Sequence, residues 1–375
     1  MPVSLRQMIV PCMVTGHVLV VALLYLHFGF NTAGEGDKYY TDALELSQGH
    51  VTQALDYQWL YSTYIIYLAF WIKFGISPRV IICISYLLSI GAYILFYRLL
   101  KREINPRVAL FWLGFMMLSP MMQYWNLSLF SEPFFIALSL YCLYVWLYPV
   151  HGRISWLMLL TALLLLVTRP SGLFVVLGTV ILWLLKHKHV SLRRLMYASV
   201  CFLGLVFILV FFFMPLHFQG YVADISSGAV YAGFPQYPLR LYPEAGYTLF
   251  DCYSQLIHEA GAGAASILVI EKCLSFFNLY RAYYSDFHNL FNVFHAVFYV
   301  FGVYALLKGS YPGNTSLAAV LRFCMAIVCL NMLLTGLFFN EWSERYTVSV
   351  FPFIFVCAAI GLHALLTPKQ QSLAV

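Results

Sequence analysis

Apolar runs long enough to cross a bilayer recur along the whole chain, with short polar connections between them. The hydrocarbon core of a bilayer is about 30 Å thick, so a spanning helix needs roughly 20 mostly apolar residues. The pattern therefore predicts an all-α, polytopic transmembrane bundle that forms a single domain over 1–375. Roughly ten spans are predicted, of which the two around 154–186 are the shortest: 8–30, 79–99, 107–122, 132–149, 154–168, 171–186, 195–215, 288–308, 317–338 and 347–366.

Two further segments are predicted as helices that lie in the membrane interface. The segment 59–75 is apolar and aromatic but short for a span, and a crossing there would turn the basic stretch 98–107 outward. Tyr and Trp are favoured at the interface. The same interpretation covers 37–50, and both segments belong to a first outer loop, 31–78. The longest hydrophilic stretch, 216–287, is predicted as a second, larger outer loop with short helices.

Composition agrees with a membrane protein. Hydrophobic residues make up 62% of the 375 residues and charged residues 10%, whereas soluble domains are nearer half apolar and a quarter charged. The formal net charge is +6, but the basic residues are spread through short connections between apolar runs. They are therefore interpreted as topology signals and not as a nucleic-acid-binding surface.

The charge pattern also predicts orientation. The first run follows only Arg6 and has no small-residue cleavage site after it, so it is interpreted as a retained helix with its N-terminus inside. Basic clusters in 98–107 and 186–194 then lie in cytoplasmic connections, as the positive-inside tendency requires. Both termini are expected in the cytoplasm of a cell with this protein in its plasma or inner membrane. Every acidic residue except Glu103 falls on the extracytoplasmic side or at the outer ends of helices.

Of the nine cysteines, all but Cys252 and Cys273 lie inside apolar runs, where a thiol behaves as a small hydrophobe. Those two lie in the polar loop 216–287. The sequence leaves open whether they form a disulfide or remain two free thiols.

Acidic and aromatic residues follow the first predicted span directly. A carboxylate held beside the membrane surface can have a pKa suited to general-base work, deprotonating a hydroxyl as it attacks a sugar carbon. Asp37 is the first candidate, with Glu35, Tyr39 and Tyr40 as neighbours in a substrate cavity. The alternative is structural, with Asp37 capping a helix and Glu35 favouring its dipole.

Three more polar clusters lie at predicted outer ends of spans: Ser131-Glu132-Pro133, Thr168-Arg169-Pro170 and Glu344-Arg345-Tyr346. Glu132 is either a second acid in an outer cavity or a residue that faces water in a first helical turn. Arg169 and Arg345 lie on the face that topology disfavours for cations, and a guanidinium suits a lipid phosphate. The alternative for these arginines is a salt bridge with a nearby Glu, such as Glu344. Tyr346 is expected to line the same cavity.

Several chemistries are not indicated. The chain has no Walker A loop and no Rossmann glycine fingerprint, so the pattern does not point to nucleotide hydrolysis or dinucleotide chemistry. The histidines are scattered without the spacing of metal ligands, so no metal site is predicted.

The order of these clusters resembles the GT-C superfamily of membrane glycosyltransferases, nearest to the branch of protein O-mannosyltransferases and lipid A aminoarabinose transferases. The matching residues are Gly36-Asp37 with Tyr39-Tyr40 and Ala43, Ser119-Pro120, Ser131-Glu132-Pro133, Thr168-Arg169-Pro170, and Glu344-Arg345-Tyr346 with Pro352. The resemblance covers most of the chain and is weak in 216–287.

The resemblance implies transfer of a hexose or pentose from a polyprenyl-phosphate donor to a glycan, lipid or protein acceptor at the extracytoplasmic face, as in building a cell-envelope glycan. It implies Asp37 as the general base, Glu132 as a second acid, and Arg169 and Arg345 as ligands of the donor phosphate. Many members carry two adjacent acids in the first loop, whereas Lys38 follows Asp37 here. No cofactor is expected, and a divalent metal is compatible with the pattern without being indicated by it.

Three rival functions remain: a transporter or flippase of lipid-linked sugars, a polysaccharide polymerase or ligase, and a scaffold subunit without chemistry. Transporters tend to place ionisable residues near the bilayer midplane and to contain broken helices. Here the charges lie at the ends of the predicted helices, which favours the transferase.

Overall fold

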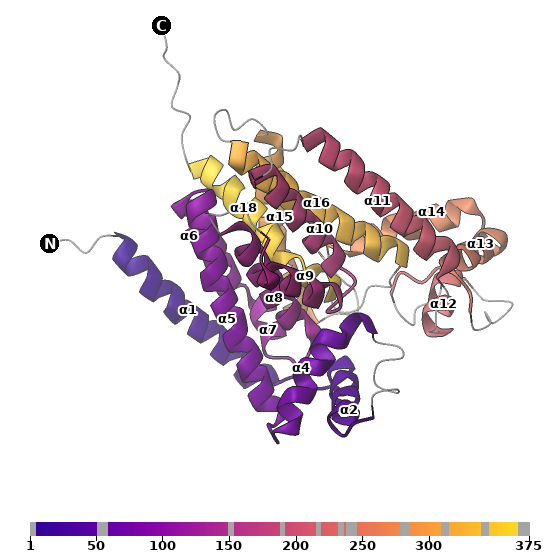
Figure 1. The fold of residues 1–375 in the computed structure, drawn as a ribbon, viewed down its shortest axis with the longest axis horizontal. Helices are drawn as coiled ribbons and strands as arrows, with labels where there is room; N and C mark the ends of the chain where they lie inside the picture. Colours follow the sequence, from indigo (N-terminus) through magenta and orange to yellow (C-terminus); the bar gives the residue numbers. More distant parts are fainter. Residues whose placement is uncertain are drawn as a thin grey trace, which may run out of the picture. The chain divides into compact units, whose positions relative to one another are not determined.

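The chain folds as an all-α protein (Figure 1). The computed structural model describes residues 5–50, 59–148, 154–187, 192–214, 219–231, 236–237, 246–277, 279, 285–308, 315–338 and 345–366. The chain divides into two compact units. Unit 1 contains Met1–Thr179, Tyr284–Ile327 and Ser349–Val375, and unit 2 contains Val180–Tyr283 and Val328–Val348.

Within the described residues, three helices are long and apolar enough to cross a membrane. They are α1 (Leu5–Phe28), α5 (Pro78–Glu103) and α16 (Thr315–Phe338). Helices of spanning length are thus confirmed at three of the predicted positions. Shorter apolar helices of 10–17 described residues occupy seven others. These are α6 (Pro106–Leu118), α8 (Ser131–Leu147), α9 (Trp156–Leu166), α10 (Gly172–His187) and α18 (Phe351–Leu366), with parts of α11 (Leu192–Phe213) and α15 (Asp286–Lys308). The total of about ten spans, and their orientation, stay predictions.

The predicted span 107–122 is broken. Helix α6 ends at Leu118, and α7 (Pro120–Asn126) begins after an extended Ser119. Pro120 explains the break, because proline has no N–H to donate and disfavours the helical conformation of the residue before it. Two carbonyls freed by the break are satisfied: Gln123 Nε2 donates to Met116 O at 2.7 Å, and His17 Nδ1 lies 2.8 Å from Met117 O. The last predicted span, 347–366, is likewise divided into α17 (Arg345–Val348) and α18.

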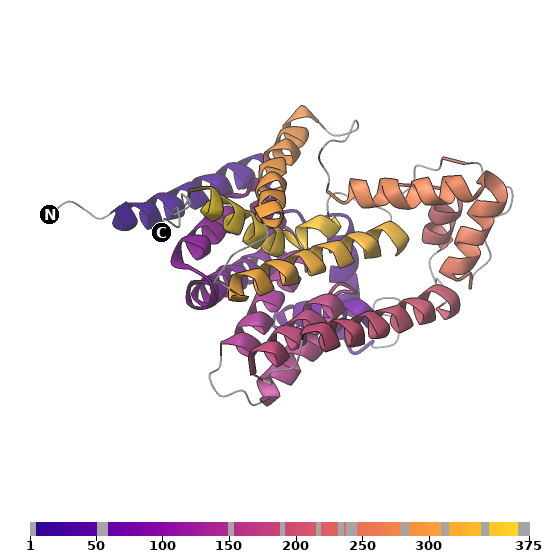
Figure 2. The ribbon, with the colours of Figure 1, turned by 90° about the horizontal axis from the view of Figure 1, so that it is seen from above.

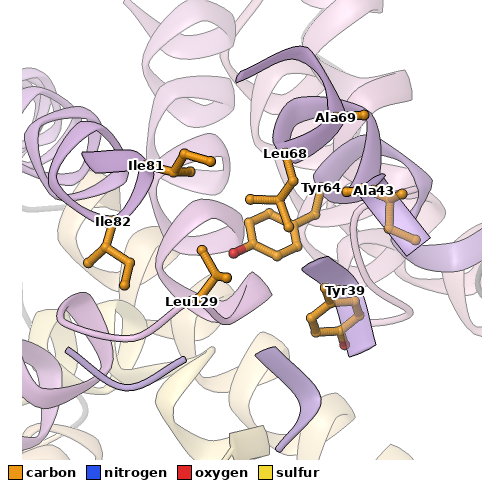
Figure 3. Packing of buried hydrophobic residues seen from close by; sticks show 9 residues of the cluster. Tyr39, Ala43, Tyr64, Leu68, Ala69, Ile81, Ile82 and Leu129 are labelled. Atoms are coloured by element: carbon orange, nitrogen blue, oxygen red, sulfur yellow. The ribbon is translucent and has the colours of Figure 1, made fainter. Parts of the chain in front are cut away.

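The segments predicted as interfacial are helical, as α2 (Glu35–Ser47), η1 (Trp59–Tyr61) and α4 (Ser62–Lys73). Helices α2 and α4 pack on the start of α5 through one apolar cluster. Figure 3 shows Tyr39, Tyr64 and Leu129 together in this cluster. Its buried members are Tyr39, Ala43, Tyr64, Ile65, Leu68, Ala69, Ile81, Ile82 and Leu129. First-loop residues are therefore part of the core of unit 1.

The other helices of unit 1 form its main core. Helices α15 and α18 approach so closely that a Cβ on Gly361 would lie 1.9 Å from Phe301 O. The indole Nε1 of Trp112 on α6 donates to Pro352 O at 2.9 Å, which joins α6 to the start of α18. Gly361 and the Pro352 carbonyl in the first turn of α18 thus both take part in packing.

Unit 2 is built on α12 (Gln219–Ser226), α13 (Leu249–Ala260) and α14 (Ala262–Ser275). Helix α13 starts with a capping box in which Thr248 N donates to Asp251 Oδ2 at 2.8 Å. Gly261, with φ +89°, makes the turn into α14, and Figure 2 shows the resulting pair of helices in salmon and orange. Cys252 and Cys273 are both free thiols here, so the disulfide alternative is not realised.

Candidate functional site

The start of the first loop is joined to the segment that precedes α8. Asn31 and Ser128 form a parallel β-bridge, in which Asn31 N donates to Leu127 O at 3.0 Å and Leu129 N donates to Asn31 O at 2.8 Å. A Cβ on Gly36 would lie 3.0 Å from Leu129 O. A glycine therefore lets the first turn of α2 lie directly against this backbone.

Two of the predicted cavity residues on α2 are joined by a hydrogen bond. Tyr39 is buried, and its hydroxyl donates to Glu35 Oε2 at 3.1 Å. The Tyr39 ring packs against the rings of Tyr61 and Tyr64, with centroid distances of 5.4 and 5.5 Å. Tyr40 is half-buried beside this cluster. The aromatic pair of the first loop thus divides into a buried member and a half-buried one.

Asp37, the predicted base, is exposed on the other side of α2, and its backbone carbonyl accepts a hydrogen bond from Thr41 Oγ1 at 2.8 Å. The N-cap position is Gly34, which makes no side-chain cap, so Asp37 lies inside the helix and is not its cap. Asp42, one turn later, is half-buried. Burial raises the pKa of the Asp42 carboxyl, Lys38 opposes this shift, and Glu45 adds to it.

The start of α8 carries a buried ion pair with the turn between α9 and α10. Glu132 is 0% exposed and Arg169 is 2% exposed, and the Nη1 of Arg169 contacts Glu132 Oε1. The same Nη1 lies 3.0 Å from Ser131 Oγ, which accepts its hydrogen bond. Glu132 therefore faces protein and not water. The salt-bridge partner of Arg169 is Glu132, whereas the sequence suggested Glu344 as an example.

Local sequence explains how Arg169 is held. Pro170 and Gly172 follow it, and Gly172 N donates to Arg169 O at 2.9 Å. A Cβ on Gly172 would lie 2.1 Å from Leu165 O, so a glycine is required where α10 starts against the end of α9. Thr168 Oγ1 donates to Leu164 O at 2.6 Å. These contacts hold the turn against the end of α9.

Two tyrosines that the sequence analysis did not single out link the first loop to this pair. The guanidinium carbon of Arg169 lies 5.9 Å from the centre of the Tyr61 ring, and Tyr61 also packs on Tyr39. Burial raises the pKa of the Tyr64 phenol well above its ordinary value, and Tyr67 and Glu132 add to this. Tyr64 is therefore a neutral phenol next to the ion pair. Its position in an apolar, aromatic run carried no signal of this role.

Helix α4 is hydrogen-bonded to the end of α9 and the same turn. Thr63 N donates to Val167 O at 3.1 Å, and Thr63 Oγ1 donates to Leu164 O at 2.9 Å. Three of the sequence clusters, at 35–40, 131–133 and 168–170, thus meet in unit 1 around Tyr39, Tyr61 and Tyr64.

The fourth cluster belongs to unit 2. Arg345 is buried at the start of α17 and Tyr346 is half-buried. Glu344 lies outside the described residues. Within unit 2, Thr347 Oγ1 donates to Phe276 O, which ties α17 to the end of α14.

The cluster in unit 1 combines an exposed carboxylate, an aromatic wall and a buried ion pair that is close to neutral overall. Asp37 can accept a proton, and the half-buried Tyr40 and Tyr61 can stack a ring, whereas Tyr39 and Tyr64 are buried. Among the described residues, no group of three or more His, Cys, Asp or Glu side chains is arranged to hold a metal ion.

Comparison with protein-family models, with curated proteins and with solved structures finds no match to this chain.

Proposed function

We propose that this chain is a membrane glycosyltransferase that moves a sugar from a polyprenyl-phosphate donor to an acceptor at the extracytoplasmic face. The observation that supports the proposal is the meeting of the clusters at 35–40, 131–133 and 168–170, which are far apart in the sequence. A protein that used these polar residues only to end its helices would not need to gather them around one set of tyrosines.

The chemistry assigned to Asp37 is that of a general base. Its carboxylate accepts the proton of an acceptor hydroxyl while that oxygen bonds to the anomeric carbon of the donor sugar. The bond from the anomeric carbon to the phosphate oxygen breaks, and the polyprenyl phosphate leaves with the electron pair. Exposure on α2 leaves Asp37 accessible to an acceptor, and Tyr40 and Tyr61, which are only half-buried, are the tyrosines on which a sugar can pack.

The ion pair is assigned a positioning role. Glu132 and Arg169 hold the start of α8 against the turn before α10. They therefore keep in place the residues against which α2 packs. The roles of Glu132 as a second acid, and of Arg169 and Arg345 as ligands of the donor phosphate, remain predictions from the resemblance.

The test is sugar transfer by the purified chain in the presence of a polyprenyl-phosphate sugar and an acceptor. Asp37→Asn keeps the shape of the side chain and removes proton acceptance. Loss of a general base typically lowers turnover by about 10²–10⁴-fold, so a fall of that size is expected with little change in donor binding. Asp42→Asn and Glu45→Gln are the matched controls on the same helix, and they are expected to stay near the activity of the original chain. Full activity of a folded Asp37→Asn variant would remove Asp37 from the mechanism.

A flippase of lipid-linked sugars is the second candidate, and the broken α6–α7 helix favours it. At this break Ser119 Oγ lies 2.8 Å from His295 Nε2, and both residues are buried. Discontinuous helices with buried polar groups are typical of transporters. Movement of a fluorescent polyprenyl-phosphate sugar across vesicles, unchanged in Asp37→Asn and lost in His295→Leu, would favour this function over transfer.

A further inference from the structure

Helix α14 in unit 2 is apolar on two opposite faces. On one face Ala265 and Leu268 are buried in the core of α12, α13 and α14. On the other face lies the α14 stripe, which consists of Ile267, Ile270 and Leu274, spaced by three and four residues. Each residue of the stripe is more than half exposed. A helix that is apolar all round is normally buried, either in protein or in a membrane, so the stripe is expected to have a cover.

The contacts of α14 with the second half of α16, which also belongs to unit 2, indicate its depth. The candidate span Leu317–Phe338 has 22 residues, and its length of about 33 Å matches the hydrocarbon core of a bilayer. Cys273 Sγ lies 3.8 Å from Met332 O, and a Cβ on Gly336 would overlap the same sulfur. Met332 lies about 9 Å inside the end of the span, at 1.5 Å per residue. The second half of α14 therefore runs beside the last two turns of a helix that can cross the membrane.

Helix α13 lies at the end of the same span, where Tyr253 Oη donates to Leu337 O at 3.1 Å. The exposed residues of α13 are divided between two sides of the helix. Phe250 and Ile257 are seven residues apart and share one side. His258 is exposed about a quarter-turn further round, on a polar side. Helix α13 therefore has one side suited to lipid and one suited to water.

The apolar surface of α13 continues onto α11. The ring of Phe250 packs on that of Phe212 with centroids 5.1 Å apart, and the ring of Tyr253 packs on that of Phe211 at 6.0 Å. Phe212, Phe213 and Phe250 are all exposed. Helix α11 overlaps a predicted span, so this shared surface runs from a lipid-facing helix onto the hairpin of α13 and α14. Lipid covers both parts without a break, which argues for lipid and against a separate protein partner.

We propose that the hairpin of α13 and α14 is embedded in one interface of the bilayer, where lipid acyl chains cover the α14 stripe. In the predicted orientation this is the extracytoplasmic interface. Interfacial helices bury an apolar face about 5–10 Å into the boundary between head groups and acyl chains, and the depth of about 9 Å at Met332 lies in this range. Part of the large outer loop predicted at 216–287 is thereby a membrane-bound element. The proposal does not depend on the transfer reaction proposed above.

Photolabelling of the full chain in phosphatidylcholine vesicles tests this proposal. A fraction of the phosphatidylcholine carries a photoreactive diazirine in one acyl chain, and mass spectrometry of the peptides locates the adducts. Leu333, an exposed residue near the end of α16, is the reference. Ile267, Ile270 and Leu274 are expected to carry adducts about as often as Leu333, whereas His258 is expected to carry none.

Adducts on Leu333 without adducts on the α14 stripe would overturn the proposal. Crosslinks between two chains through the stripe would show that a second copy covers it, and labelling of the stripe by a water-soluble diazirine would show that it faces water. Either result would also overturn the proposal.

Two matched variants decide whether the labelling depends on the apolar face. Ile270→Asp places a charge in the stripe and is expected to lose the adducts on Leu274, because the carboxylate draws this face toward water. His258→Asp places the same charge on the polar side of α13 and is expected to be labelled like the original chain. Equal labelling of Leu274 in both variants would contradict a lipid-covered stripe. The result for the original chain stands even where a variant does not fold.

Discussion

Two regions of this protein bury a cation in opposite ways. In unit 1, Arg169 is 2% exposed and contacts both Glu132 and Ser131. In unit 2, Lys272 is 0% exposed and makes no hydrogen bond among the described residues. The difference shows that a buried charge can either stabilise or destabilise the folded state, depending on whether it has a partner. A paired cation holds two elements of the fold together, whereas an unpaired one weakens the fold until the loss of its proton removes the cost.

The largest effect is expected from separating the pair in unit 1. Arg169→Met leaves the Glu132 carboxylate buried without its counter-charge, and such changes typically cost about 3–5 kcal/mol of stability. Denaturant unfolding in mixed micelles measures this loss.

The double variant Arg169→Met with Glu132→Gln is the control, because it removes both charges together. It is expected to lose less stability than the sum of the two single variants. Additive losses would show that the two side chains do not act as a pair.

The next effect is the pH dependence that Lys272 gives to unit 2. Burial lowers the pKa of Lys272 from 10.5 to about 7, although Asp224 and Cys252 act to raise it. Below about pH 7 the amine is charged in both the folded and unfolded states, so the folded state carries the full cost of the buried charge. Between about pH 7 and 10.5 the unfolded state binds the extra proton, and the stability rises with pH by about 1.4 kcal/mol per unit.

Unfolding of the original chain and of Lys272→Met over a series of buffers measures this contribution. The difference in stability between the two chains is expected to be largest below pH 7 and to shrink as the pH rises. A difference that stays constant over this range would mean that Lys272 does not titrate with a lowered pKa.

The smallest effect compares two buried serines, Ser131 in unit 1 and Ser226 in unit 2. Ser131→Ala removes the acceptor of a hydrogen bond from Arg169 and is expected to cost about 1.5 kcal/mol, the lower end for bonds to charged groups. Ser226→Ala removes a hydroxyl that makes no hydrogen bond among the described residues, so it is expected to change stability by less than about 0.5 kcal/mol. Equal losses for the two serines would contradict the contrast between the two regions.

Part of the candidate site could be recognised in the sequence. Glu35, Tyr39, Glu132 and Arg169 were identified because charged and aromatic residues at the ends of apolar runs are conspicuous. Their partners were not identified. Nothing near Arg169 in the chain indicates that it pairs with Glu132, and Tyr61 was hidden within an aromatic run that is explained equally well by the membrane interface.

The break at Ser119 shows a different limit. Ser119-Pro120 is a local signal for the end of a helix, but the apolar run continues across it and a single span, 107–122, was predicted. Where the helix stops depends on whether the freed carbonyls find partners. His17 and Gln123 supply them in the folded chain, and His17 comes from a helix distant in the sequence.

By itself, the sequence determined the helical character of this protein, the positions of its long apolar helices and the polar residues at their ends. These properties depend on run length, proline and glycine, which act over a few residues. Only the tertiary structure decided which charges are paired, because Glu132 and Arg169 are joined by packing between elements far apart in the chain. It also decided that Lys272, in a stretch predicted as a polar outer loop, lies in an apolar core. Burial is a property of how helices pack together, and no local pattern in the sequence contains it.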